Sequence, residues 1–188
     1  MKTANDSPVQ FTGPGEVRLV RSLPGPIERV WAYLTEPDKR ATWLARGPFE
    51  AKTGGRITLE FHNSKLSAPG DKIPAKYAAD CQDGCNFTGR VVRCEPPRVL
   101  VHTWGEADGS ESEVTFELAP DGGRVRFTLT HRRLGDNRAM LVGVSAGWHT
   151  HVAILVAQLE GTPAPSFWST HTRLEADYEK LLPTPAPA

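Results

Sequence analysis

A single change of hydrophobic period divides the sequence and most constrains its fold. Apolar side chains recur at every second position in four short segments, at residues 86–94, 98–104, 112–118 and 124–132. Short links rich in Pro, Gly and Asp join these segments, and such links connect antiparallel neighbours. From Asn137 to Gly161 the apolar positions instead follow the helical period of about 3.6 residues. The pattern predicts an antiparallel meander followed by one long helix.

The segments that flank this region predict shorter elements. Residues 16–23 alternate like a strand, and the following Pro-Gly-Pro interrupts it before a short helix over 27–34. Pro37 begins a second short helix that carries Trp43 and Leu44, and residues 57–61 alternate like another strand. Residues 166–182 predict a last helix, whose apolar stripe consists of Phe167, His171, Leu174, Tyr178 and Leu181.

The long helix carries apolar residues on two opposite sides. One narrow sector of its helical wheel contains Leu141, Val144, Trp148, Val152, Leu155 and Leu159. Ala146, Ala153 and Ala157 lie opposite, so protein should cover both sides of the helix. A long antiparallel sheet curls as it twists, and a helix across its concave face buries both apolar surfaces. We therefore expect an α+β fold, a curved antiparallel sheet wrapped around the long helix, with an apolar cavity where the layers diverge.

The charge balance of the 188-residue chain excludes some partners. It has 22 Lys and Arg against 22 Asp and Glu, whereas proteins that bind nucleic acids or anionic membranes usually show a basic excess or stripe. We expect neither partner. No run of about 20 apolar residues and no apolar leader is visible, so a cytoplasmic location is expected.

The three cysteines predict neither a disulfide framework nor a metal site. Cys81, Cys85 and Cys94 are an odd number in a chain long enough to fold without cross-links, which favours reduced thiols. Three residues separate Cys81 from Cys85, and no second pair follows that could complete a tetrahedral zinc site. We therefore expect no metal, and the chain has no motif that requires a cofactor.

The chain should form one domain between two loose ends. Residues 1–14 are expected to be a flexible arm, 15–182 the domain, and 183–188 a disordered tail. Within the domain, residues 63–85 are polar and carry Pro and Gly, and loops of this length are often functional. They are expected to form a lid or rim over the cavity, anchored by Leu66, Ile73 and Tyr77, or else a surface excursion.

Four pieces of sequence carry a resemblance to known proteins. They are LPGPIERVWAYLT at 23–35 with Pro37 and Trp43, EPPRVL at 95–100 with Thr103-Trp104, Leu129-Thr130-His131, and Gly147-Trp148. In this order and spacing they resemble the START-like, or SRPBCC, helix-grip superfamily. Within that superfamily they are similar to the bacterial branch named after the activator of the heat-shock protein 90 ATPase. The resemblance extends over residues 17–161, and the last helix resembles a common extension of this branch.

The resemblance implies a Bet v 1/START-like helix-grip fold whose pocket holds an apolar molecule in relatives. It does not imply a single activity. Non-covalent binding of a small hydrophobic or amphipathic ligand is the expected function. One alternative is a polyketide cyclase, aromatase or hydrolase type of enzyme, and another is a chaperone-associated or toxin–antitoxin interaction module. A single domain lacks the multi-domain context of the namesake's chaperone activity, so we do not expect that interaction. A homodimer is compatible with the sequence, but no pattern indicates one.

Candidate site residues follow from the predicted inner faces of the sheet and the long helix. His102, His131 and His151 would share the cavity, where they could transfer protons or only make structural hydrogen bonds. No nucleophile motif accompanies them, so no residue is assigned a catalytic role. The expected ligand-binding residues are Trp43, Phe61, Leu100, His102, Trp104, Phe116, Phe127, Trp148, His151 and Leu155.

Overall fold

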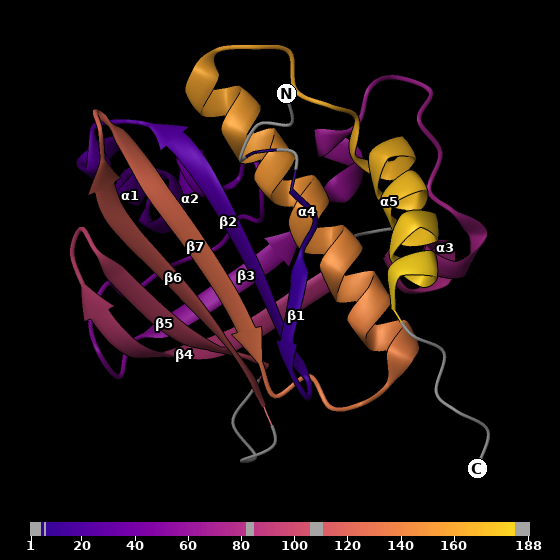
Figure 1. Ribbon diagram of the computed structural model, residues 1–188, viewed down its shortest axis with the longest axis horizontal. Coiled ribbons are helices and arrows are strands. Elements are labelled where there is room, and N and C mark those ends of the chain that lie inside the picture. The colour runs from indigo at the N-terminus through magenta and orange to yellow at the C-terminus, as the bar shows by residue number, and fades with distance from the viewer. Residues whose placement is uncertain (1–4, 6, 82–84, 106–110, 183–188) are drawn as a thin grey trace.

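The computed structural model describes residues 5, 7–81, 85–105 and 111–182, and its centre is one antiparallel sheet. The seven strands follow the order β1-β2-β7-β6-β5-β4-β3 (Figure 1). Their bounds are Gln10–Gly13 (β1), Glu16–Pro24 (β2), Arg56–Phe61 (β3), Cys85–Glu95 (β4), Val99–Trp104 (β5), Ser112–Asp121 (β6) and Arg124–Arg132 (β7). The predicted meander is β4 to β7, so that part of the prediction is confirmed.

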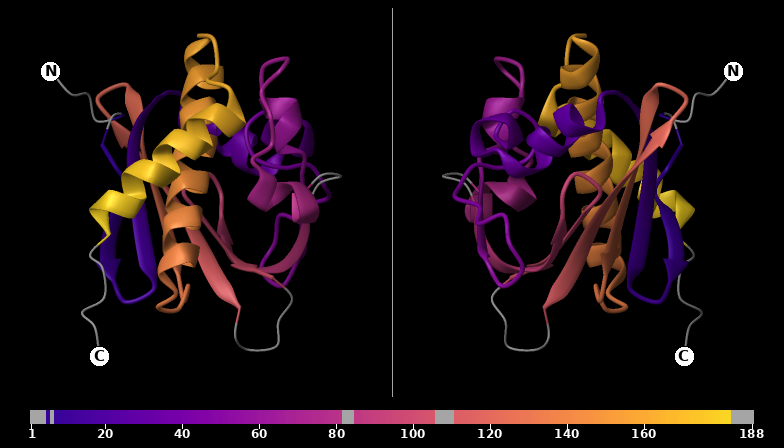
Figure 2. Two further views of the ribbon diagram at one scale, coloured as in Figure 1. Left: turned by 90° about the vertical axis from the view of Figure 1, so that its right-hand side faces the viewer. Right: turned by 90° about the vertical axis from the view of Figure 1, so that its left-hand side faces the viewer.

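The helices occupy the concave side and the open end of this sheet. They are α1 (Ile27–Thr35), α2 (Pro37–Arg40), the 3-10 helix η2 (Asn63–Leu66), α3 (Ala75–Cys81), α4 (Arg138–Glu160) and α5 (Phe167–Leu181). Figure 2 shows the sheet curving around α4, with α5 lying against α4 on the side away from the sheet. The α+β helix-grip fold expected from the sequence is confirmed. The second short helix is shorter than predicted, since Trp43 and Leu44 follow α2 in a turn.

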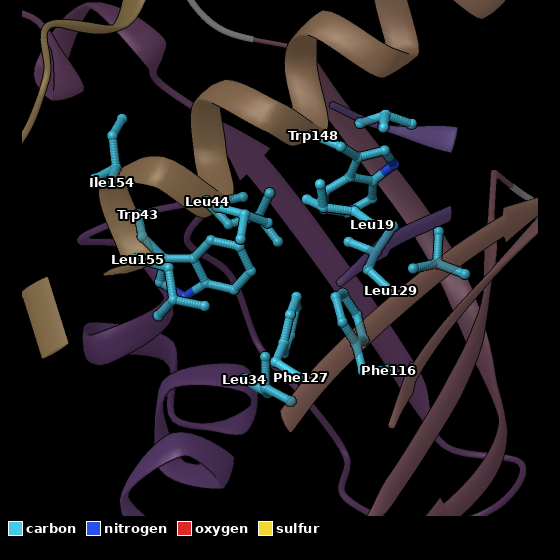
Figure 3. Packing of buried hydrophobic residues seen from close by; sticks show 14 of the residues in the cluster. Leu19, Leu34, Trp43, Leu44, Phe116, Phe127, Leu129, Trp148, Ile154 and Leu155 are labelled. Carbon is cyan, nitrogen blue, oxygen red and sulfur yellow. The ribbon is translucent and has the colours of Figure 1, made fainter. Parts of the chain in front are cut away.

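The core lies between the central strands and α4. Leu100 of β5 is opposite Phe116 of β6, and Phe116 is opposite Leu129 of β7. All three side chains are almost fully buried, and Figure 3 shows side chains of the sheet and of α4 pointing into the same space. Burial of this much apolar area is the main term that holds the two layers together.

Helix α4 is buried on most of its circumference, as its two apolar sides predict. Trp148 and Leu155 are buried, and so are Ala146 and Ala157 on the other side. The Asn137 side chain caps the helix by accepting a hydrogen bond from the Met140 N–H, and Gly161 ends it in the left-handed conformation. By length and composition α4 could cross a membrane, contrary to our reading of the sequence. In this fold it is the core helix.

Two expectations from the sequence are wrong: the flexible arm over residues 10–13 and the reduced thiol of Cys85. Residues 10–13 were assigned to the flexible arm, but they form β1, which pairs with β2, and the Val9 N–H donates to the Tyr178 hydroxyl at 2.7 Å. A four-residue edge strand has too few residues for its alternation to be visible in the sequence. Cys85 is disulfide-bonded, whereas Cys94 is a free thiol as expected. Residues 1–4, 6 and 183–188 lie outside the described residues.

The segment 63–85 is more ordered than its sequence indicates. It contains η2 and α3, and its predicted anchors Leu66, Ile73 and Tyr77 pack against the core. The side chains near the end of α3 and residues 82–84 lie outside the described part of the segment. That the segment acts as a lid stays a prediction.

Candidate functional site

A cavity of about 230 Å³ lies where α4 and α5 diverge from the β3–β4 end of the sheet. We call it the α4–α5 cavity. The sheet contributes Cys85, Phe61, Phe87, Trp104 and His131, and the segments after α2, in η2 and in α3 contribute Leu44, Asn63 and Tyr77. The two long helices contribute Val144, Gly147, Trp148, His151, Phe167, Trp168 and His171.

Aromatic rings in contact with one another form most of the wall. The Trp104 and Trp148 ring centroids are 5.2 Å apart in an edge-to-face arrangement, and Phe61 lies 5.7 Å from Trp104. Such pairs hold each ring in one orientation and stabilise the wall beyond the area they bury. Phe87, which also contacts Phe61, is 38% exposed, so the cavity reaches the surface beside β4.

His131 is held in a single neutral form at the sheet side of the cavity. The Trp148 indole N–H donates to its Nδ1 at 3.0 Å, so that nitrogen carries no proton. Its Nε2 then donates to the Ser112 hydroxyl at 2.8 Å. Burial, and to a smaller degree the neighbouring His102, lowers the pKa of His131 to about 3. Both ring nitrogens are engaged, so His131 is a structural part of the wall.

His151 faces the cavity from α4, where Phe61 and Phe167 flank its ring. Its Nδ1–H donates to the Trp43 carbonyl at 2.7 Å, which leaves Nε2 as the unprotonated nitrogen. Burial lowers the pKa of His151 to about 4. The ring is therefore neutral at pH 7, with an acceptor nitrogen and no charge to offer a ligand.

His102 lies behind the cavity wall. Its Nδ1–H donates to the Thr103 carbonyl at 2.9 Å, and its ring packs between Trp104 and Phe116. Burial lowers its pKa to about 4. The three predicted histidines thus do not share the cavity: His131 and His151 line it, and His102 does not. The described residues contain no cluster of three or more His, Cys, Asp or Glu that could hold a metal ion.

Four of the residues expected to bind a ligand line the cavity, and six do not. Phe61, Trp104, Trp148 and His151 are in the wall. The other six are buried in the core between the layers: Trp43, Leu100, His102, Phe116, Phe127 and Leu155. Four of the six lie on strands, namely Leu100, His102, Phe116 and Phe127, and their inward orientation was predicted correctly. In the middle of the sheet, however, the side chains of the strands and of α4 fill the space between the layers and leave no room for a ligand.

The residues that the sequence analysis missed come mainly from α5 and α3. Phe167 and Trp168 close the cavity on the side away from the sheet, and the Tyr77 ring stacks on Trp168 at 5.7 Å. The Tyr77 hydroxyl donates to Glu175 Oε1 at 2.7 Å, and Lys76 Nζ lies 2.6 Å from the same oxygen. These contacts fix α3 to α5. The apolar stripe of the last helix was visible in the sequence, but its position over the cavity was not.

The fold and this cavity define a helix-grip domain of the START-like, or SRPBCC, class. The model of the family "Activator of Hsp90 ATPase homolog 1-like protein" matches residues 24–160. The chain belongs to that family, as its sequence motifs predict. A search of curated protein sequences finds no match.

Solved structures agree with this assignment. The protein encoded by gene BPP1335 of Bordetella parapertussis is 42% identical, with a TM-score of 0.74, over 95% of this chain and 92% of that one. CalU16 from Micromonospora echinospora is 23% identical (TM-score 0.62; 88% and 87% covered), and DynU16 is 24% identical (0.60; 83% of this chain and 51% of that one). The two more distant proteins show the fold alone.

Proposed function

We propose that this protein binds an uncharged, mainly apolar small molecule non-covalently in the α4–α5 cavity. The observation that carries the proposal is the composition of the wall: aromatic rings dominate it, and its described residues include no Asp, Glu, Lys or Arg. Its buried histidines have lowered pKa values and are neutral at pH 7. A charged ligand would lose its hydration without gaining an ionic partner, and that loss is costly.

The size of the cavity favours a ligand of about two fused rings. An engineered apolar cavity of ~150 Å³ accepts benzene, whereas drug-sized ligands occupy pockets of roughly 300 Å³ or more. The α4–α5 cavity, at about 230 Å³, lies between these sizes. DynU16 is described as a protein of the dynemicin biosynthetic locus, which is consistent by analogy with a role in small-molecule metabolism.

Gly147 offers a test that fills the cavity without damage to its wall. It lies inside α4, lines the cavity, and a Cβ added there would meet no atom within 4 Å. We expect Gly147→Leu to abolish binding of naphthalene, measured by calorimetry and quenching of Trp fluorescence. The same variant should raise the free energy of unfolding by about 0.5–1 kcal/mol, because glycine is unfavourable inside a helix.

Gly147→Ala is the matched control. It removes the same helical penalty but adds only one methyl group, so naphthalene should still bind within about threefold of the wild-type affinity. This limit corresponds to well under 1 kcal/mol. Absence of naphthalene binding to the wild type would contradict the proposal. Equal binding by Gly147→Leu would place the ligand elsewhere.

The alternatives have less support from the structure. An enzyme of the cyclase or hydrolase type would need His102, His131 or His151 as a proton acceptor near neutral pH, but their pKa values of about 3 to 4 make them weak bases. An interaction module would be favoured by a filled interior and a continuous exposed apolar patch. The interior contains a cavity instead, and the large exposed apolar side chains among the described residues are Phe87, Val92, Met140 and Leu181, from three different elements.

A further inference from the structure

Two buried polar atoms that belong to cavity-lining residues have no hydrogen-bond partner. They are Nδ1 of His171 and Oδ1 of Asn63. Native proteins satisfy nearly all buried polar atoms, so each exception requires an explanation. His131 uses both ring nitrogens and His151 uses Nδ1 on the Trp43 carbonyl, and neither has a fully buried side-chain atom without a partner.

The unpartnered nitrogen of His171 is a hydrogen-bond acceptor. The ring hydrogen-bonds to the backbone of Gly143 in a way that favours its protonated form, as donation to a carbonyl does. Because Nδ1 has no partner, this donor is Nε2, and the neutral ring carries its lone pair on Nδ1. Glu175 Oε2 is 3.9 Å from Nδ1, beyond hydrogen-bonding distance.

The packing around His171 fixes this nitrogen in place. The His171 side chain is only 7% exposed, its ring stacks on Phe167 at 5.6 Å, and the Tyr77 ring meets it edge-on at 5.3 Å. Tyr77 is itself held through Glu175. An acceptor that is held by its neighbours can select a ligand group by direction as well as by polarity.

Asn63 lies on the same α5 side of the cavity. It begins η2, and η2 is attached to the start of α5 because Ser64 Oγ accepts from the Trp168 indole N–H at 3.2 Å and Ser67 Oγ accepts from the Trp168 backbone N–H at 3.3 Å. The two unpartnered acceptors therefore belong to the two elements that contact each other through Trp168. Both residues line the cavity, and both atoms require a donor.

We propose that the ligand is a hydroxylated aromatic molecule whose hydroxyl group donates a hydrogen bond to His171 Nδ1. Asn63 Oδ1 offers a second position for a donor on the same side. The aromatic wall selects the ring system, and His171 selects the hydroxyl group and sets the orientation of the ligand. This inference rests on the proposed function, and it concerns α5, which lies beyond the residues that the family model matches.

Two probes that differ by one hydrogen-bond donor test the inference. 2-Naphthol can donate a hydrogen bond, and 2-methoxynaphthalene has the same rings and oxygen but no donor. At pH 7.5 the wild type should bind 2-naphthol about tenfold more tightly, as one net hydrogen bond allows. In His171→Phe the ratio should fall to about one, with the affinity for 2-methoxynaphthalene unchanged. His149→Phe is the control, since His149 is on α4 and hydrogen-bonds to Tyr178 but does not line the cavity.

The outcomes separate this inference from the proposed function. A wild-type ratio near one overturns the inference even if His171→Phe fails to fold, and so does a high ratio that persists in a folded His171→Phe. In both cases binding of naphthalene itself would leave the proposed function standing. Absence of naphthalene binding would overturn the proposed function.

Discussion

Acidification from pH 7 to pH 4.5 should unfold the domain, because three buried histidines stay neutral in the folded state at pH values where the unfolded chain protonates them. Burial lowers the pKa of His102 and His151 to about 4 and that of His131 to about 3. In the unfolded chain each would titrate near pH 6.5. Between these values the unfolded state binds more protons, so the free energy of unfolding falls as the pH falls.

The expected size of this effect is large relative to the stability of a domain. Each such histidine contributes a slope of about 1.4 kcal/mol per pH unit below pH 6.5, down to its folded pKa. Three together give about 4 kcal/mol per pH unit, against a typical total stability of 5–15 kcal/mol. Urea unfolding followed by Trp fluorescence at several pH values between 7.5 and 5 measures the slope.

A variant at one histidine checks the origin of the slope. His102→Asn keeps a side-chain N–H that can donate to the Thr103 carbonyl, but it cannot titrate in this range. We expect its slope to be smaller than that of the wild type by about 1.4 kcal/mol per pH unit, the contribution of one histidine. Carboxyl groups affect the stability only at lower pH. The hydrogen bond from the Thr12 hydroxyl, for instance, lowers the pKa of Glu16, so the stability from that bond is lost only below about pH 4.5. A stability that stays constant from pH 7 to pH 5 would show that these rings are not neutral in the folded state.

The sheet and the long helix could be predicted from the sequence, because each produces a regular spacing of apolar residues. The alternation within residues 86–132 predicts the strands of the meander, and the helical period of residues 138–160 predicts the helix packed on them. The short strand β1 was not predicted, because its four residues are too few to show an alternating pattern. The disulfide at Cys85 was not predicted either, since an expected cytoplasmic location and a long chain favour reduced thiols only on average.

The cavity was harder to predict because it depends on where the layers diverge. Phe61 and Phe127 are both buried side chains of strands, but only Phe61 lines the cavity. The wall on the side away from the sheet includes Phe167 and His171. Both belong to the apolar stripe of the last helix, but the stripe does not indicate which part of the protein it covers. His131 and His151 were correctly placed together, because β7 and α4 face each other.

Trp43 and Trp104 should differ in their response to truncation, because Trp43 belongs to the core and Trp104 to the cavity wall. Trp43 is fully buried, its indole N–H donates to the Tyr33 carbonyl at 2.8 Å, and its own carbonyl accepts the His151 hydrogen bond. Trp43→Ala should therefore lower the free energy of unfolding by about 3–5 kcal/mol. At roughly 2–4 °C for each kcal/mol, that is a fall in Tm of about 10 °C.

Trp104 is half-buried and has the cavity on one side, so its removal loses fewer packing contacts. Trp104→Ala should cost about 1–2 kcal/mol less than Trp43→Ala, because less area is uncovered. It should also weaken naphthalene binding about tenfold, since the Trp104 ring is a main part of the aromatic wall. Thermal unfolding and calorimetry of the two variants measure both effects. Equal destabilisation by the two substitutions, with naphthalene affinity unchanged in Trp104→Ala, would mean that Trp104 belongs to the core and that no ligand touches it.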